Sequence, residues 1–220
     1  MHSRALKRVG VVLFAVGAIA IAMTIAVVTE ARPYSAAFDV AAMLAGTFLW
    51  RGGPRAALWT RSLTVFLLAA GVATLVAAPF FQPLDLTVTQ IRLNPAGFGM
   101  NAAVGLFVLG LLLWITLELG RPPVLEAISG AGIKRWDIRI PAQAGGGLVA
   151  LIGLLLWLTL HGRSAELATS LALQQLGPGY RYHLSWISSA NNGHGTSVTG
   201  VVTAWNTKET KQVLLHWETP

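Results

Sequence analysis

The sequence FGMNAAVGLFVLGLLLWITL, at residues 98–117, has no charged side chain in twenty consecutive positions. A helix of this length spans about 30 Å, which is the thickness of the hydrocarbon core of a bilayer. Long uncharged runs are typical of transmembrane helices rather than of soluble cores. The stretch therefore predicts an integral membrane protein that has the lipid bilayer as its solvent.

Four further apolar stretches lie on either side of this one. They are Val9–Val28, Ser35–Trp50, Ala57–Pro79 and Gly146–Leu160. The first reaches about 20 residues, longer than the 7–15 of a signal-peptide core, so we expect a retained helix. The second reaches only about 24 Å, so we expect it to be short or to end in the interface. We predict about five transmembrane helices within residues 1–162.

The composition agrees with a membrane protein, since 54% of the residues are hydrophobic and 11% are charged. A soluble domain carries about 25% charged residues. The chain has no cysteine, which excludes disulfides, cysteine zinc sites, iron–sulfur clusters and thiol nucleophiles. Its net charge is +7, but no basic run alternates with aromatic residues as a nucleic-acid surface would, so we predict no nucleic-acid partner.

The distribution of charge predicts the orientation. Five spans with a cytoplasmic N-terminus place residues 1–8, 51–61 and 118–143 in the cytoplasm, with ten basic and three acidic residues. The other side then has six basic and six acidic residues. Lys and Arg accumulate on the cytoplasmic side, so we predict a periplasmic C-terminus. The many Ala, Gly, Leu and Arg residues are typical of a GC-rich bacterium, so we expect the bacterial inner membrane.

Two connections between the predicted spans are polar. Residues 80–95 are expected to form a loop, in which residues 84–89 alternate like a short strand. In residues 118–143, Pro122-Pro123 ends the preceding helix. The weakly amphipathic stretch that follows is either a helix along the membrane surface, with Trp136 at headgroup depth, or an ordinary loop.

The polar residues 163–220 predict a small α+β domain outside the membrane. Ser164 is the expected N-cap of a helix that ends at Gly177-Pro178. Three strands follow, at about 180–186, 197–205 and 211–217, with Asn192-Gly193 in the first turn. We expect an antiparallel meander with the helix on one face, above Tyr182, Leu184 and Trp186. The fold class is thus a membrane α-helical bundle, residues 1–162, with a C-terminal α+β domain.

No catalytic, metal or cofactor site is predicted from the sequence. It contains neither the metal spacings H-x-x-x-H and HExxH nor a Walker loop or a G-x-S-x-G elbow. Asp39 is the one acidic residue within a predicted span, and intramembrane acids are functional candidates. A transporter normally has more than one such group.

Three hypotheses about function follow. The first is an accessory, assembly or anchoring subunit whose outer domain binds another membrane or periplasmic protein, and we favour it. Its candidate partner-binding residues are aromatic: Tyr180, Tyr182, Trp186, Trp205 and Trp217. The second is a small transporter or channel that uses Asp39. The third is a membrane enzyme at the outer surface, which would use residues drawn from Asp85, Arg92, His161 and His183.

Overall fold

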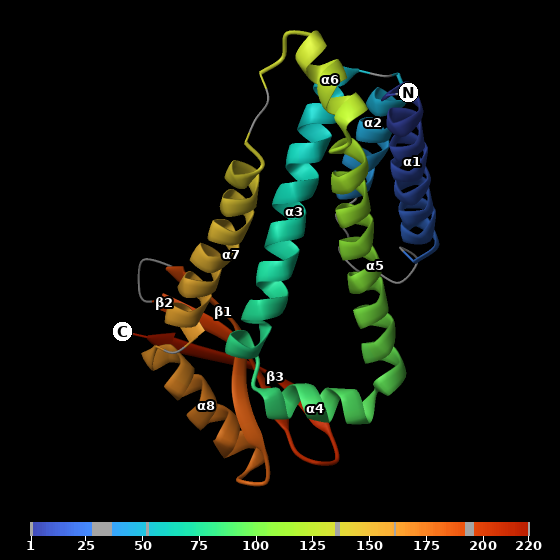
Figure 1. The fold of residues 1–220 in the computed structure, drawn as a ribbon. Coiled ribbons are helices and arrows are strands. Elements are labelled where there is room, and N and C mark those ends of the chain that lie inside the picture. The colour runs from blue at the N-terminus through green and yellow to red at the C-terminus, as the bar shows by residue number, and fades with distance from the viewer. Residues whose placement is uncertain are drawn as a thin grey trace. The chain divides into compact units, whose positions relative to one another are not determined.

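The structure is a computed structural model that describes residues 2–27, 37–51, 53–134, 137–160, 162–191 and 196–219. It is mostly helical, with a three-stranded antiparallel sheet near the C-terminus (Figure 1). The elements in chain order are α1 (His2–Val27), α2 (Ala37–Trp50), α3 (Pro54–Phe81), α4 (Leu84–Leu93), α5 (Pro95–Leu119), α6 (Pro122–Gly130), α7 (Arg139–Leu160), α8 (Arg163–Leu176), β1 (Arg181–Asn191), β2 (Thr196–Trp205) and β3 (Thr210–Thr219).

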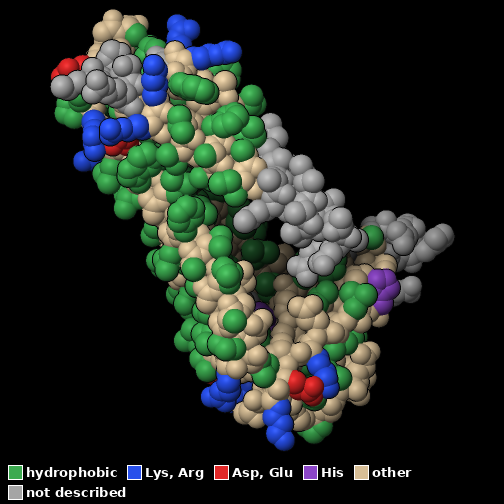
Figure 2. Space-filling view, turned by 90° about the vertical axis from the view of Figure 1, so that its right-hand side faces the viewer, with side chains coloured by type: hydrophobic (Ala, Val, Ile, Leu, Met, Phe, Trp, Pro, Cys, Tyr) green, Lys and Arg blue, Asp and Glu red, His purple; other side chains and the backbone are tan. Residues whose placement is uncertain are grey.

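Among the described helices, three (α3, α5 and α7) are long and apolar enough to cross a membrane. They have 28, 25 and 22 residues, or about 42, 37 and 33 Å, against about 30 Å for the hydrocarbon core. Between 11% and 17% of the most apolar stretch of each helix is buried inside the protein, and hydrophobic side chains cover much of the helical surface (Figure 2). Three of the predicted spans are therefore confirmed as helices suited to a bilayer.

The two N-terminal spans, in α1 and α2, are not among the described helices that the structure supports as membrane-spanning. The described part of α2 has 14 residues, or about 21 Å, which is shorter than the hydrocarbon core. Residues 28–36, which connect it to α1, lie outside the described residues. The count of five spans stays a prediction.

The loop predicted at residues 80–95 was wrong, because α3 continues to Phe81 and α4 occupies Leu84–Leu93. Pro83 is the N-cap of α4, a position at which its missing N–H costs no helical hydrogen bond. The alternation at residues 84–89 suggested a strand, but the segment also repeats at helical spacing, with Leu84, Val88 and Ile91 on one side. When a short stretch fits both the strand and the helix period, its packing against other elements decides which secondary structure it forms.

The second polar connection, residues 118–143, contains helix α6. Pro122 and Pro123 end the preceding helix as predicted, but they also form the first turn of α6. Val124 and Ile128 of α6 are buried in a hydrophobic core. The amphipathic stretch is therefore a helix whose apolar side packs on protein. Trp136 lies outside the described residues.

The chain divides into two compact units, Met1–Gly71 with Val108–Gly146, and Val72–Phe107 with Gly147–Pro220. In the first unit, side chains of α1, α2, α3, α5 and α6 form one core. Within it α1 and α2 cross at Gly10 and Gly46, and a Cβ on either glycine would lie 2.7 Å from the carbonyl oxygen of the other. Only glycine allows two backbones to approach this closely.

The second unit contains the predicted C-terminal helix and meander. The strand order is β1-β2-β3, and each neighbouring pair is antiparallel. Helix α8 covers one face of the sheet with three buried alanines, which pack on Leu184, Val202 and Leu215. It begins after Gly162, with no side-chain cap, instead of at the predicted cap Ser164, and it ends at Gly177 with φ 78°. The predicted domain boundary at residue 162 stays a prediction.

A β-bulge in β1 corrects one part of the predicted pattern. Leu184 pairs with Val202 but Trp186 pairs with Val201, so Ser185 is an extra residue in the ladder. Because one extra residue moves all later side chains to the opposite face, Trp186 points away from α8 and is 50% exposed. Ile187 takes the expected place of Trp186 in the core.

Candidate functional site

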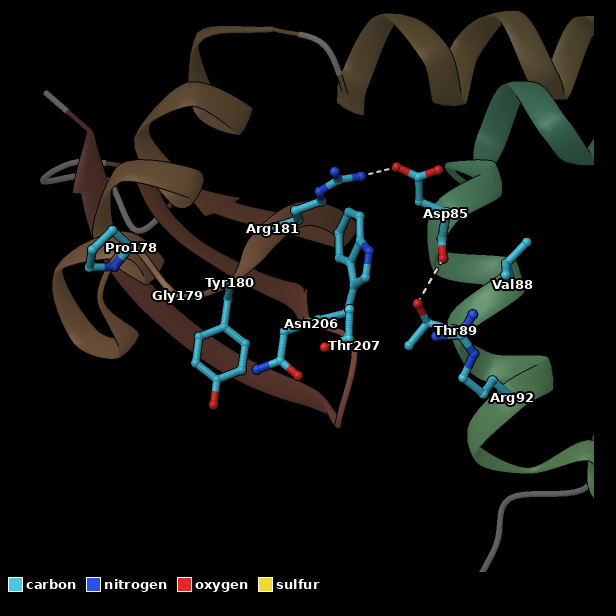
Figure 3. Close-up of a pocket in the computed structure, with 11 residues that line it drawn as sticks. Asp85, Val88, Thr89, Arg92, Pro178, Gly179, Tyr180, Arg181, Asn206 and Thr207 are labelled. Atoms are coloured by element: carbon cyan, nitrogen blue, oxygen red, sulfur yellow. Dashed lines mark hydrogen bonds and ion pairs between the residues drawn. The ribbon is translucent and has the colours of Figure 1, made fainter.

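A cleft of about 580 Å³ lies between α4 and the sheet, at the start of β1 and the turn between β2 and β3 (Figure 3). Its volume is within the range of natural ligand sites. We call it the α4 cleft. It is lined by Asp85, Val88, Thr89, Arg92, Pro178, Gly179, Tyr180, Arg181, Trp205, Asn206 and Thr207.

One wall of the cleft is the polar side of α4. Asp85, Thr89 and Arg92 recur at three- and four-residue intervals, so they share one side of the helix. The Asp85 carboxylate pairs with the Arg181 guanidinium of β1, and the Thr89 hydroxyl donates to the Asp85 carbonyl at 2.9 Å. The pair is exposed, so it contributes at most about 1 kcal/mol, and its main effect is to hold α4 beside β1.

The opposite wall is held by the turn between β2 and β3. The Asn206 carboxamide oxygen accepts the backbone N–H groups of Lys208 at 2.8 Å and Glu209 at 2.9 Å, which is an Asx turn. Lys211 donates to Glu209 at 2.8 Å and to the Tyr180 hydroxyl oxygen at 2.9 Å. Hydrogen bonds from Lys211 and Tyr180 lower the pKa of Glu209, and the bond to Glu209 raises the pKa of Lys211. Both groups are therefore charged near neutral pH.

The end of α3 covers the sheet beside the cleft. The His183 ring nitrogen Nε2 lies 2.9 Å from the carbonyl oxygen of Phe81, the last residue of α3, and donates to it. The hydroxyls of Ser185 and Thr203 form a hydrogen bond on the same face. This face, opposite α8, is thus occupied in its first half by α3 and α4.

The four residues considered for a surface enzyme separate into two groups. Asp85 and Arg92 line the cleft, whereas His183 bonds to Phe81 and His161 lies outside the described residues. His183 and His216 are kept apart because β2 lies between their strands. Within the described ranges, no three His, Cys, Asp or Glu side chains are grouped so that they could hold a metal ion.

The five aromatic residues predicted to bind a partner differ in accessibility. Tyr182 and Trp217 pack against the core under α8. Tyr180 and Trp205 line the cleft, and Trp205 is only 5% exposed. Trp186 is half exposed on the face opposite α8. Partner binding by these residues stays a prediction, and Trp186 presents the most open aromatic surface among them.

An apolar row across the sheet accompanies Trp186. Trp186 pairs with Val201 of β2, and Val201 pairs with Leu214 of β3, so the three side chains lie side by side on one face. Leu214 is 68% exposed. Sequence reasoning missed this row because strict alternation placed Trp186 in the core, and only the bulge at Ser185 aligns it with Leu214.

Other site residues were missed for a related reason. Arg181, Thr89 and Asn206 become neighbours only when α4 packs beside the sheet. The i, i+4, i+7 spacing of Asp85, Thr89 and Arg92 is the sequence signal that could have indicated a polar helix side. Asp39 lies near the start of α2, and its side chain is outside the described part of the structure.

Comparison with known proteins leaves the geometry as the only guide to function. The chain matches no protein-family model, no curated protein and no solved structure. A fold alone does not define an activity, so the function has to be argued from the cleft, the apolar row and the sheet edges.

Proposed function

We propose that the chain is a membrane-anchored accessory or assembly subunit that binds another membrane or periplasmic protein through its C-terminal α+β domain. The observation that carries the proposal is the outer edge of β3, together with the apolar row Trp186–Val201–Leu214 that ends there. The partner is a protein that adds an extended segment to this edge.

The edge of β3 has the features of a strand-docking site. Its ten residues pair with β2 in continuous register from Thr210 to Thr219, without a bulge or a proline. In the described sheet no strand pairs with its other side, and only its first residue, Thr210, lines a cleft with residues of α4 and α5. Long regular edges expose backbone N–H and C=O groups that another strand can pair with. The other edge, β1, is interrupted by its bulge, and two of its side chains, Arg181 and His183, contact α4 and α3.

The apolar row supports a protein partner at this edge. A strand paired with β3 would bring a fourth side chain beside Leu214 and extend the row by one position. Burying a leucine side chain contributes about 1.5–3 kcal/mol, so the row would add specificity to the backbone pairing. The next row, Ser188–Thr199–His216, is polar, which limits the apolar contact to one line across the sheet.

Replacing Leu214 with lysine is expected to abolish partner binding, because a charge on an edge strand opposes pairing with a second strand. The measurement is purification of the full-length chain in mild detergent with its stoichiometric partner, followed by amide exchange of β3 with and without that partner. Gln174→Lys, which adds the same charge to the exposed side of α8, is the control and should retain the partner.

Three outcomes would contradict this binding mode. The first is equal partner recovery with Leu214→Lys and Gln174→Lys. The second is unchanged exchange of β3 amides in the complex. The third is that Leu214→Lys weakens only self-association of the chain or only its binding to protein-free vesicles. The edge would then bind a second copy of the chain or lipid.

The membrane arrangement is part of the proposal. We infer five spans with a cytoplasmic N-terminus in a bacterial inner membrane, since ten basic and three acidic residues fall on the cytoplasmic side in that arrangement. Helix α1 supports a fourth crossing, because its 26 residues reach about 39 Å and include a long uncharged stretch.

A periplasmic C-terminus predicts that alkaline phosphatase fused after Pro220 is active in intact bacteria. The same fusion position should give no fluorescence with a reporter that folds only in the cytoplasm. Fusions after Arg121 should show the reverse pattern, because that residue lies in a predicted cytoplasmic connection. A fluorescent, phosphatase-inactive Pro220 fusion would contradict the arrangement.

A further inference from the structure

Helix α4 connects α3 to α5, which are two of the described helices that are long and apolar enough to cross a membrane. Only Gln82 and Pro83 separate it from α3, and only Asn94 separates it from α5. Two residues of extended chain reach about 7 Å, so α4 must lie close to the ends of both helices. Where these helices leave the hydrocarbon core, the surroundings are lipid headgroups.

The two sides of α4 differ in polarity. Leu84, Val88 and Ile91 recur at i, i+4 and i+7, so they share one side of the helix, and all three are exposed. The adjacent side carries Asp85, Thr89 and Arg92 and faces the α4 cleft (Figure 3), and Val88 lies at the border and also lines the cleft. A short amphipathic helix with an exposed apolar side is suited to the boundary between acyl chains and headgroups.

The cleft has an excess of positive charge. Arg92 and Arg181 line it, and Asp85, which pairs with Arg181, is the single carboxylate among its lining residues. Arg92 is exposed and forms no ion pair with any residue that the structure describes. Asn206 uses its carboxamide oxygen in the turn, so its amide N–H groups remain as donors at the cleft wall. These groups favour an anion with several oxygen acceptors.

The cleft also has apolar surface that can contact the apolar portion of a ligand next to its anionic group. Val88 and Trp205 line it together with the arginines. Val88 is 54% exposed and supplies most of this surface, since Trp205 is only 5% exposed. A ligand with a phosphate and an adjoining glycerol or acyl portion matches this combination better than a fully solvated anion does.

We propose that the α4 cleft binds the phosphate-bearing headgroup of an anionic phospholipid. The phosphate lies at Arg92 and Arg181, and the acyl chains follow the exposed Leu84–Val88–Ile91 side of α4. An arginine pair with one compensating carboxylate disfavours a headgroup that carries its own cation, so the site selects phosphatidylglycerol over phosphatidylcholine.

The test is lipid binding to the purified full-length chain in mild detergent, with bound lipids counted by native mass spectrometry. The probes are phosphatidylglycerol and phosphatidylcholine with identical acyl chains, and glycerol 3-phosphate as a soluble phosphate. Arg92→Gln is expected to weaken phosphatidylglycerol binding about tenfold, the effect of one lost charge-assisted hydrogen bond. Arg92→Lys, which keeps the charge, should lose less.

The matched control is Lys208→Gln, which removes one positive charge from the β2–β3 turn at a residue that does not line the cleft. It should bind phosphatidylglycerol as the unchanged chain does.

Equal affinities for Arg92→Gln and Lys208→Gln, or no preference for phosphatidylglycerol over phosphatidylcholine, would overturn the proposal. If glycerol 3-phosphate binds as tightly as phosphatidylglycerol, the cleft is a site for a soluble phosphate and the lipid proposal is wrong. Partner recovery in the Arg92 variants should be unchanged, which separates this site from the β3 edge.

Discussion

Replacing Gly46 with leucine is expected to separate α1 from α2 and to destabilise the first unit by about 3 kcal/mol. A Cβ at Gly46 would lie 2.7 Å from the carbonyl oxygen of Gly10 and 2.8 Å from the backbone nitrogen of Phe14. These are backbone atoms, so the clash is relieved only by moving α1 as a whole. Leucine favours a helix over glycine by about 1 kcal/mol, which is too little to offset the clash.

The separation would also open the core that α1 and α2 share. Val9 and Leu13 of α1 and Leu49 of α2 are buried at this crossing. Separating the helices would take these side chains out of contact, so lost core packing adds to the cost of the clash.

The chain has no cysteine, so spin labels will attach only at cysteines introduced by mutation. Labels on Phe14→Cys and Trp50→Cys, two exposed positions beside the crossing, report the distance between α1 and α2. We expect a longer and broader distance distribution for Gly46→Leu, and a lower melting temperature in detergent. The control is Gly105→Leu in α5, where the described structure has no atom within 4 Å of an added Cβ. An unchanged distance and melting temperature for Gly46→Leu would show that the helices do not meet at these glycines.

The parts of the fold that were predicted from the sequence are those that one dominant force decides. Exclusion of charge over some twenty residues requires a helix in lipid, which identified α3, α5 and α7. Strand alternation and turn residues identified the meander, because a sheet with one covered face needs that period. In both cases the local pattern and the tertiary environment agree.

The rest depended on contacts between segments distant in the sequence. Helix α4 was predicted as a loop because Pro83 and Asn94 resemble loop residues, although they flank the helix without interrupting it. The position of Trp186 depended on a single inserted residue, which no period in β1 indicates. The α4 cleft joins residues far apart in the sequence, such as Asp85 and Arg181 at a separation of 96 positions, so it follows only from packing.

Replacing Leu184 with alanine is expected to destabilise the C-terminal domain by about 3 kcal/mol, the usual effect of a large-to-small change in a core. Leu184 is 3% exposed and lies between α8 and the sheet, with one of its methyl carbons 3.3 Å from the position of a Cβ on Gly200. The layer of α8 and the sheet is small, with a core of six buried residues in the described part, so the neighbours can do little to fill the cavity.

Amide exchange of β2 in the full-length chain measures this loss, because β2 is paired on both sides and opens only when the sheet does. A change of about 3 kcal/mol corresponds to roughly hundredfold faster exchange. Leu214→Ala is the matched control, since it removes the same atoms from the same sheet at a side chain that is 68% exposed, and β2 protection should change little. Equal acceleration in both variants would mean that the two faces of the sheet are buried alike. That result would remove the distinction between the structural face under α8 and the exposed face opposite it, on which the proposed binding role of Trp186 and Leu214 depends.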